Sequence, residues 1–216
     1  LNVRPLYEAR GRLRMAFSKI IAEPTKEVNV IGVAIAITID EGPEFKLGAV
    51  RYAGTVLKQA KELDGLAKWR KDEMANFDEI KAGLDRITRR YKSTGYLHAA
   101  SIADRTVNDP EHTVDLVVNV DTGALYAYGK LEIRGLDLIG EPAVRKMWGL
   151  REGKPYDAEA PAAFLKEVQD QAMFDNLGAA SSEIKVNEAA KIVDVTLLFA
   201  GTKLRDSGRK KLGQIP

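Results

Sequence analysis

The chain of 216 residues carries 33 basic and 31 acidic residues, which gives a net charge of +2 at pH 7. This balanced charge gives no strong reason to expect nucleic acid or an anionic membrane as a partner. Because the sequence contains no cysteine, disulfides and thiol chemistry are excluded. The longest nearly unbroken apolar run, residues 30–39, is about half as long as a membrane-spanning helix requires.

A pattern of glycine and aromatic residues occurs twice in the chain, at an offset of 81 positions. Its two copies are Gly42, Phe45, Gly48 and Gly54, and then Gly123, Tyr126, Gly129 and Gly135. Self-similarity at a fixed period indicates an array of copied supersecondary units. We therefore expect complete repeats at residues 43–123 and 124–201, preceded by the C-terminal part of a truncated repeat at 1–42 and followed by a basic linker or tail at 202–216.

A second motif, an aromatic residue four positions before a glycine, occurs three times. Its copies are Tyr7 with Gly11, Tyr91 with Gly95, and Phe174 with Gly178. In the truncated repeat we expect only the last helix, at residues 13–22, and an extended segment at residues 28–40.

The first half of the second repeat is predicted to be a strand followed by two helices. The strand covers residues 47–53, and the first helix covers residues 55–69. The second helix is indicated by apolar residues at steps of three and four, which are typical of a helix that faces a core: Phe77, Ile80, Leu84, Ile87 and Tyr91. Asp78 is the expected N-cap, and Gly95 suits a left-handed C-terminal cap.

The second half of this repeat is predicted to be a hairpin. Residues 97–107 and 113–121 flank the turn-forming residues 108–112. Apolar residues occupy every second position along the second strand, which places Val114, Leu116, Val118 and Val120 on one face. The next repeat follows the same pattern with Ile184, Val186, Val193, Val195 and Leu197. The predicted fold class is α+β, with tandem β-α-α-β-β domains that each form a three-stranded mixed sheet with two helices on one face.

No catalytic, cofactor-binding or metal-binding constellation is evident, so we do not expect an enzyme. The spacing of Gly135, Gly140, Glu141 and Pro142 matches a phosphate-binding loop but places Glu and Pro where Lys and Ser or Thr are required. The only histidines, His98 and His112, have no evident nucleophile or ligand partners.

Basic residues crowd the second predicted helix of the repeat at 43–123. They are Lys81, Arg86, Arg89, Arg90 and Lys92. This run is either a solvated helix face or a docking patch for acidic partners, lipid headgroups or nucleic acid. Without interleaved exposed aromatic residues, nucleic acid is the weakest of these alternatives.

Three segments together resemble POTRA domains, the polypeptide-transport-associated repeats of BamA-type and TamA-type outer-membrane assembly factors. These segments are residues 41–54, the loop at 150–157 that contains Gly153, Pro155 and Tyr156, and residues 91–97. Their order, repeated at a period of about 80 residues, carries the resemblance, which covers residues 1–201.

The resemblance implies a periplasmic arm that is attached to the outer membrane through a C-terminal β-barrel of the same parent chain. Its expected partners are unfolded outer-membrane polypeptides and accessory assembly subunits, with no nucleic acid and no cofactor. The alternative is a docking scaffold of the same domain type in a two-partner secretion transporter or a cell-division protein.

An edge strand exposes unpaired backbone amides and carbonyls, to which an extended client can add a strand. In the POTRA family the first strand of the final hairpin is usually the exposed edge, which maps to residues 97–105 and 180–186. The alternative is that these strands are structural and covered by a neighbouring domain. The candidate binding residues are Leu97, Ala99, Ser101, Ala103, Arg105, Ala180, Ser182 and Ile184.

Overall fold

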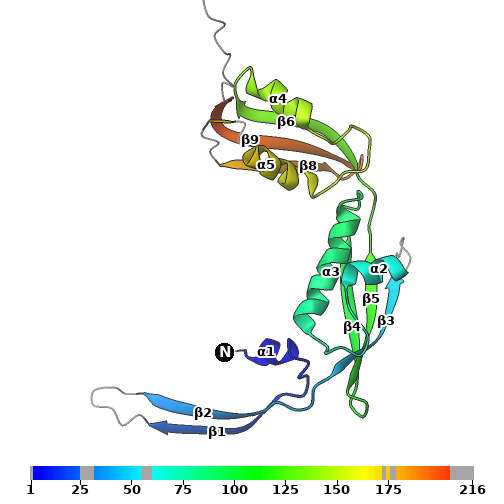
Figure 1. The fold of residues 1–216 in the computed structure, drawn as a ribbon, viewed down its shortest axis with the longest axis vertical. Coiled ribbons are helices and arrows are strands. Elements are labelled where there is room, and N and C mark those ends of the chain that lie inside the picture. Colours follow the sequence, from blue (N-terminus) through cyan, green and yellow to red (C-terminus); the bar gives the residue numbers. More distant parts are fainter. Residues whose placement is uncertain (1, 25–31, 55–59, 172–173, 176–178, 205–216) are drawn as a thin grey trace, which may run out of the picture. The chain divides into compact units, whose positions relative to one another are not determined.

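The computed structural model describes residues 2–24, 32–54, 60–171, 174–175 and 179–204 (Figure 1). The chain divides into two compact units, one of residues 1–88 and 100–121 and one of residues 89–99 and 122–216. Within the described ranges no helix is both long enough and apolar enough to cross a membrane.

The first unit begins with a short helix and a two-stranded antiparallel hairpin. These elements are α1 (Arg4–Glu8), β1 (Ala16–Pro24) and β2 (Val33–Asp40). The predicted helix at residues 13–22 is therefore wrong. The helix ends before Gly11, which has a positive φ of 68°, and Arg12 N donates to Tyr7 O at 2.9 Å. The extended chain that follows pairs with β2. Residues 28–31 of the predicted extended segment lie outside the described residues.

A β-α-α-β-β repeat follows the hairpin, and it forms a mixed three-stranded sheet as predicted. Its elements are β3 (Lys46–Gly54), α2 (Ala60–Ala67), α3 (Phe77–Lys92), β4 (Ala100–Asn108) and β5 (Thr113–Asp121). The strand order is β3-β5-β4, with β5 parallel to β3 and antiparallel to β4. Residues 55–59 of the predicted first helix lie outside the described residues.

The apolar face of β5 forms the core of this repeat. All four alternating residues that the sequence predicts, Val114, Leu116, Val118 and Val120, are buried. From α3, Ile80 packs against Val114 and Leu116 in one cluster. Leu84, expected in the core, is only partly buried. The buried stripe instead passes through Gly83, where a Cβ would collide with the indole of Trp69, so the helix approaches the tryptophan closely at a residue without a side chain.

Asn76, and not Asp78, caps the N-terminus of α3. The Oδ1 atom of Asn76 accepts the backbone N–H groups of Asp78 at 2.9 Å and Glu79 at 3.2 Å. Because the helix begins at Phe77, Asp78 lies inside its first turn. Gly95, by contrast, has the positive φ expected of a C-terminal cap, 101°.

The second unit contains the other complete repeat. Its elements are β6 (Ala127–Leu136), α4 (Gly140–Met147), α5 (Ala160–Asp170), β7 (Phe174–Asp175), β8 (Ala180–Asn187) and β9 (Ile192–Leu204). Here β9 is parallel to β6 and antiparallel to β8, and the two-residue β7 also pairs with β9. Val193, Val195 and Leu197 are buried as predicted, whereas Ile184 is 46% exposed.

The two complete repeats share a set of backbone hydrogen bonds at the start of their first strands. Phe45 N donates to Gly11 O at 2.9 Å in the first unit, and Tyr126 N donates to Gly95 O at 2.8 Å in the second. The bond from Ala75 N to Phe45 O likewise recurs as that from Tyr156 N to Tyr126 O, both at 2.9 Å. The side chains of Phe45 and Tyr126 are buried.

Carboxylates of the central strands explain one pair of the recurring glycines, Gly48 and Gly129. Asp115 Oδ1 accepts Ala49 N at 2.7 Å, and Asp194 Oδ1 accepts Lys130 N at 3.0 Å. A Cβ at Gly48 or Gly129 would collide with the same carboxylate oxygen. Both glycines lie where the parallel register shifts, which is typical of a bulge.

We predict that Ile87→Ala lowers the free energy of unfolding of the second repeat by about 2 to 5 kcal/mol, because Ile87 is fully buried and its truncation leaves a cavity in the core. Leu84→Ala on the same helix should cost only about 1 kcal/mol, because Leu84 is partly exposed. Urea unfolding followed by Trp69 fluorescence, in a Trp148→Phe background, measures both. Equal losses would show that the assigned stripe is wrong.

We also predict that Asn76→Ala lowers the free energy of unfolding by about 1 kcal/mol, because two amides of the first turn of α3 lose their acceptor. Asp78→Ala serves as the matched control and should cost less, because its carboxylate is not that acceptor. The same fluorescence assay compares the two variants, and a larger loss in Asp78→Ala would contradict the assignment of the cap.

Candidate functional site

The strand β4 is an outer strand of its sheet. Within the part of the chain that the structure describes, it pairs only with β5. It begins at Ala100, three residues later than the sequence predicts. Leu97 and Ala99 therefore precede the strand; Leu97 packs against the core of the second unit, and Ala99 is buried. Ser101, Ala103 and Arg105 lie on the strand.

The backbone of β5 shows which residues of β4 direct their polar groups outward. A Cβ at Gly54 of β3 would collide with the carbonyl oxygen of Val120 and would lie 3.2 Å from its nitrogen. The backbone N–H and C=O groups of Val120 therefore point toward β3. Because successive residues of a strand face opposite neighbours, Asn119 and Asp121 face β4.

The register then shows which residues of β4 direct their backbone N–H and C=O groups toward β5 and which direct them away from the sheet. Asn119 pairs with Ile102, and Asp121 pairs with Ala100, so Ala100, Ile102 and the alternate residues after them bond to β5. Ser101, Ala103 and Arg105 direct their N–H and C=O groups away from the sheet. These are three of the residues that the sequence predicts as a binding edge.

The strand β8 has the same arrangement in the second unit. A Cβ at Gly135 of β6 would collide with the carbonyl oxygen of Phe199, so Phe199 faces β6. The antiparallel register pairs Phe199 with Ala180. It follows that Ala180, Ser182 and Ile184 direct their backbone groups away from β9, and no other described strand pairs with β8.

The side chains along these outer strands differ in their exposure and in their contacts. Arg105 already interacts with two residues, because its Nη1 lies 3.2 Å from Glu8 Oε1 and its guanidinium lies 4.9 Å from the ring centroid of Phe77. Ser101 and Ala103 are partly buried, whereas Ser182 and Ile184 are exposed. The two strands therefore share a backbone pattern but present different side chains.

The basic residues of α3 do not form one free patch. Arg86 donates to the carbonyl oxygens of Leu66 at 2.8 Å and Ala67 at 2.5 Å, at the C-terminal end of α2. Arg89 lies 3.9 Å from Glu159 in the second unit. Two of the five cations thus have partners within the chain, and Arg86 holds the end of α2, which weakens the interpretation as a docking patch.

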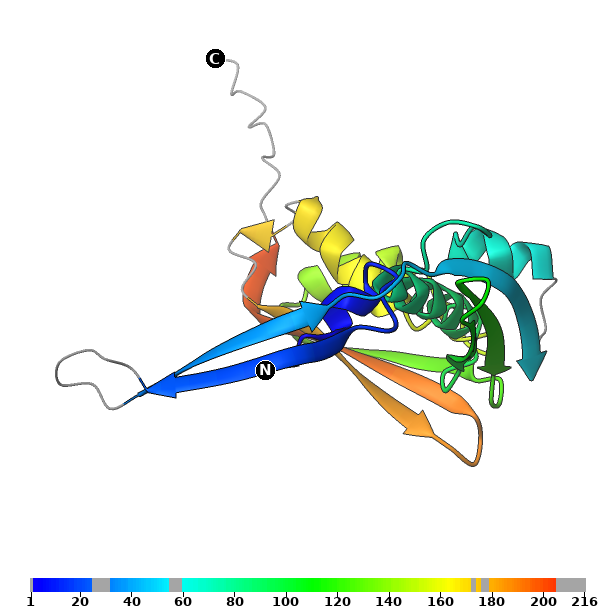
Figure 2. The same cartoon turned by 90° about the horizontal axis from the view of Figure 1, so that it is seen from below.

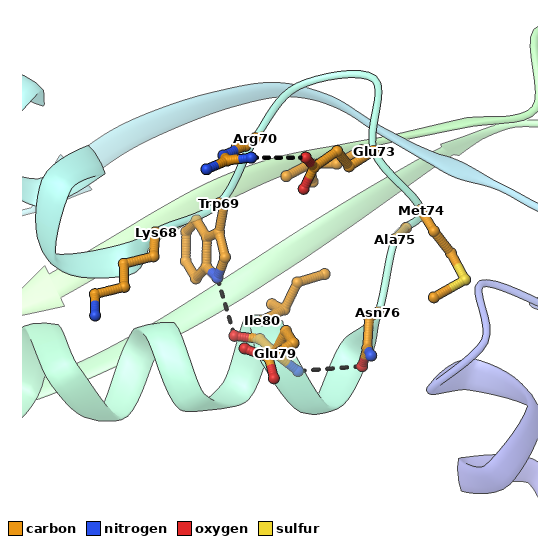
Figure 3. A pocket seen from close by; sticks show the side chains of 10 residues that line it. Lys68, Trp69, Arg70, Glu73, Met74, Ala75, Asn76, Glu79 and Ile80 are labelled. Atoms are coloured by element: carbon orange, nitrogen blue, oxygen red, sulfur yellow. Dashed lines mark hydrogen bonds and ion pairs between the residues drawn. The ribbon is translucent and has the colours of Figure 1, made fainter.

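A pocket of about 500 Å³ lies between the end of α2 and the start of α3 (Figure 3). Its lining includes Leu47 and Ile80, with the indole of Trp69 at one side. The indole Nε1 donates to Glu79 O at 3.1 Å, and Arg70 pairs with Glu73 at 3.3 Å, so polar groups at the rim bond to each other. The sequence pattern did not indicate this pocket.

A polar cluster that sequence reasoning also missed gathers around Glu188 in the second unit. Tyr126 donates a hydrogen bond from its hydroxyl group to Glu188 Oε2, and His98 Nε2 lies 3.0 Å from Glu188 Oε1. The bonds from Tyr126 and His98 hold the pKa of Glu188 below its usual value. Lys191 Nζ lies 3.4 Å from the same carboxylate. Among the residues described, no group of three or more His, Cys, Asp or Glu side chains could hold a metal ion.

The comparisons with known proteins agree with this architecture. Residues 45–123 match the POTRA family, described as surface antigen variable number repeat. The outer membrane protein assembly factor BamA of Neisseria meningitidis serogroup B is 26% identical over 144 residues, which is 66% of this chain and 18% of that protein. BamA of Buchnera aphidicola is 24% identical over 59% of this chain and 21% of its own length. The chain thus spans about a fifth of these relatives.

A solved structure shows the same fold. The crystal structure of POTRA domains 3–5 of Haemophilus influenzae BamA has a TM-score of 0.66 and 18% sequence identity, and the match covers 91% of this chain and 76% of that one. Residues 45–123 therefore match the POTRA family, and the chain as a whole is similar in fold to POTRA domains 3–5 of that BamA protein.

Proposed function

We propose that this chain is part of a periplasmic POTRA arm and binds unfolded outer-membrane polypeptides through the outer strands β4 and β8. The observation that carries the proposal is the outward row of backbone groups at Ser101, Ala103 and Arg105. An extended polypeptide pairs with such a row as an added strand. The relatives are named as assembly factors for outer membrane proteins, and such proteins are the clients proposed here.

Backbone pairing suits a protein with many clients, because main-chain hydrogen bonds do not depend on the client's sequence. Each bond contributes about 0.5 to 1.5 kcal/mol net, and part of this gain is offset by the ordering of the client. Binding by one short edge is therefore weak and reversible. This is appropriate for a site that must release its client to the next step of assembly.

The side chains along β4 support a role for the backbone. Arg105 is held by Glu8 and Phe77, so it contributes little to the choice of client. Ile102 is 63% exposed on the strand and offers one apolar contact to a chain that pairs alongside. For the parent protein we propose two further properties. It is attached to the outer membrane through a C-terminal β-barrel of the same chain, and it docks accessory subunits.

We predict that Ser101→Pro weakens binding of extended peptides while the repeat stays folded, because proline removes one outward N–H and none of the bonds between β4 and β5. Binding is measured by NMR titration with synthetic peptides copied from the strands of outer-membrane proteins. We expect the dissociation constant to increase at least threefold, which corresponds to the loss of about one hydrogen bond.

Two variants control this experiment. Ser101→Ala keeps the N–H and removes a buried hydroxyl that has no partner in the described structure, so binding should be unchanged. Ile102→Pro removes an N–H that faces β5, so it should destabilise the sheet. Unchanged peptide binding in folded Ser101→Pro would place the site elsewhere.

A further inference from the structure

The pocket between α2 and α3 contains an aromatic ring and a carboxylate that has no cation beside it. It lies in the first unit, where α2 lies beside β3 in both views (Figures 1 and 2). The indole of Trp69 stands at one side of the pocket (Figure 3), and its Nε1 donates to the backbone oxygen of Glu79 at 3.1 Å. The side chain of Glu79 lines the pocket and is exposed. Among the residues that the structure describes, none donates to its carboxylate or pairs with it.

The two basic residues of the lining leave the carboxylate of Glu79 without a counter-charge. Arg70 pairs instead with Glu73 at 3.3 Å, and both of these side chains are largely exposed. Figure 3 shows Lys68 on the opposite side of the indole from Ile80, which is buried. The space beside the indole therefore has an apolar wall and an unpaired negative charge. An aromatic face next to a carboxylate suits a cation that also carries apolar surface.

The other complete repeat has the same loop without these side chains. Leu47 N donates to Glu73 O, and Tyr128 N donates to Lys154 O, both at 2.8 Å, so the two loops correspond at an offset of 81 positions. Three residues of the pocket in the first unit change at this offset. Leu150, Lys154 and Ala160 stand in place of Trp69, Glu73 and Glu79. The combination of an indole with acidic residues is therefore no requirement of the fold.

A backbone donor at the rim also distinguishes the two loops. Glu73 and Ala75 bond to the start of β3, so the N–H of Met74 between them points away from that strand. No described residue accepts this N–H. Met74 and Pro155 hold the same place, because each forms an isolated bridge to the start of the first strand of its repeat. Proline has no N–H, so only the loop of the first unit offers a donor there.

We infer that this pocket binds an arginine side chain that an extended segment of a partner protein presents. The guanidinium stacks on the indole of Trp69 and pairs with the carboxylate of Glu79, and a backbone carbonyl of the segment accepts the N–H of Met74. Arginine fits better than lysine, because its planar group stacks on aromatic faces and is more weakly hydrated. The site uses none of the backbone groups of β4 and β8, so it is independent of strand addition at those edges.

Peptide titrations of the 216-residue chain test this inference. The probes are acetyl-Ala-Arg-Ala-amide and the same peptide with citrulline, which has a side chain of similar shape without the charge. A Trp148→Phe background leaves Trp69 as the fluorescent reporter. We expect the arginine peptide to reach half-saturation at about a tenfold lower concentration than the citrulline peptide, because only the former gains an ion pair and a cation–π contact. Equal binding of the two peptides would overturn the inference.

Two variants and one control locate the site. Glu79→Gln keeps the size of the side chain and should raise the dissociation constant of the arginine peptide about fivefold, with no change for citrulline. Met74→Pro copies the residue of the other repeat and should weaken both peptides about threefold. Asp85→Asn removes an exposed charge on α3 outside the pocket and should change nothing. Unchanged binding of the arginine peptide in Glu79→Gln or in folded Met74→Pro, or an equal loss in Asp85→Asn, would contradict the assignment.

Discussion

The central strand of each sheet is the constraint on which the rest of the structure depends. Val114, Leu116 and Val118 of β5 are buried on one face, and both backbone rows of this strand are paired, one with the parallel β3 and one with the antiparallel β4. Because an internal strand satisfies its polar groups on both sides, each outer strand keeps one row unpaired within the sheet. The outer backbone edge that we propose as a binding site is therefore a consequence of the same strand pairing that forms the fold.

The recurring glycines follow from this pairing. A carboxylate of the central strand, Asp115 or Asp194, reaches into a bulge of the first strand and accepts an N–H there. No side chain fits beside it at Gly48 or Gly129. Further along, Gly54 and Gly135 have φ values of 85° and 86° and lie against the backbone of the central strand. These glycines recur because the first strand approaches the central strand closely, at a carboxylate in one place and at the backbone in the other.

Sequence periodicity was sufficient for the repeated elements and for β5, because apolar residues at every second position from 114 to 120 fit only one strand register when one face is buried. It failed where a side chain acts across the fold. Leu84 continues the helical stripe, but the indole of Trp69 occupies the space beside Gly83. Asn76 caps α3 in place of Asp78, and only the geometry of the preceding loop distinguishes these two side chains, which are two residues apart and can both cap a helix. The cluster of His98 with Glu188 joins residues that are far apart in the sequence.

Amide hydrogen exchange of the intact chain, with and without a saturating peptide copied from an outer-membrane strand, tests whether β4 accepts an extended polypeptide along its outward backbone groups. We expect slower exchange at Ser101, Ala103 and Arg105, with little change at Ile102 and Asp104, which already bond to β5. Peptide binding that protects neither this alternating row nor the equivalent row of β8 would contradict the proposal.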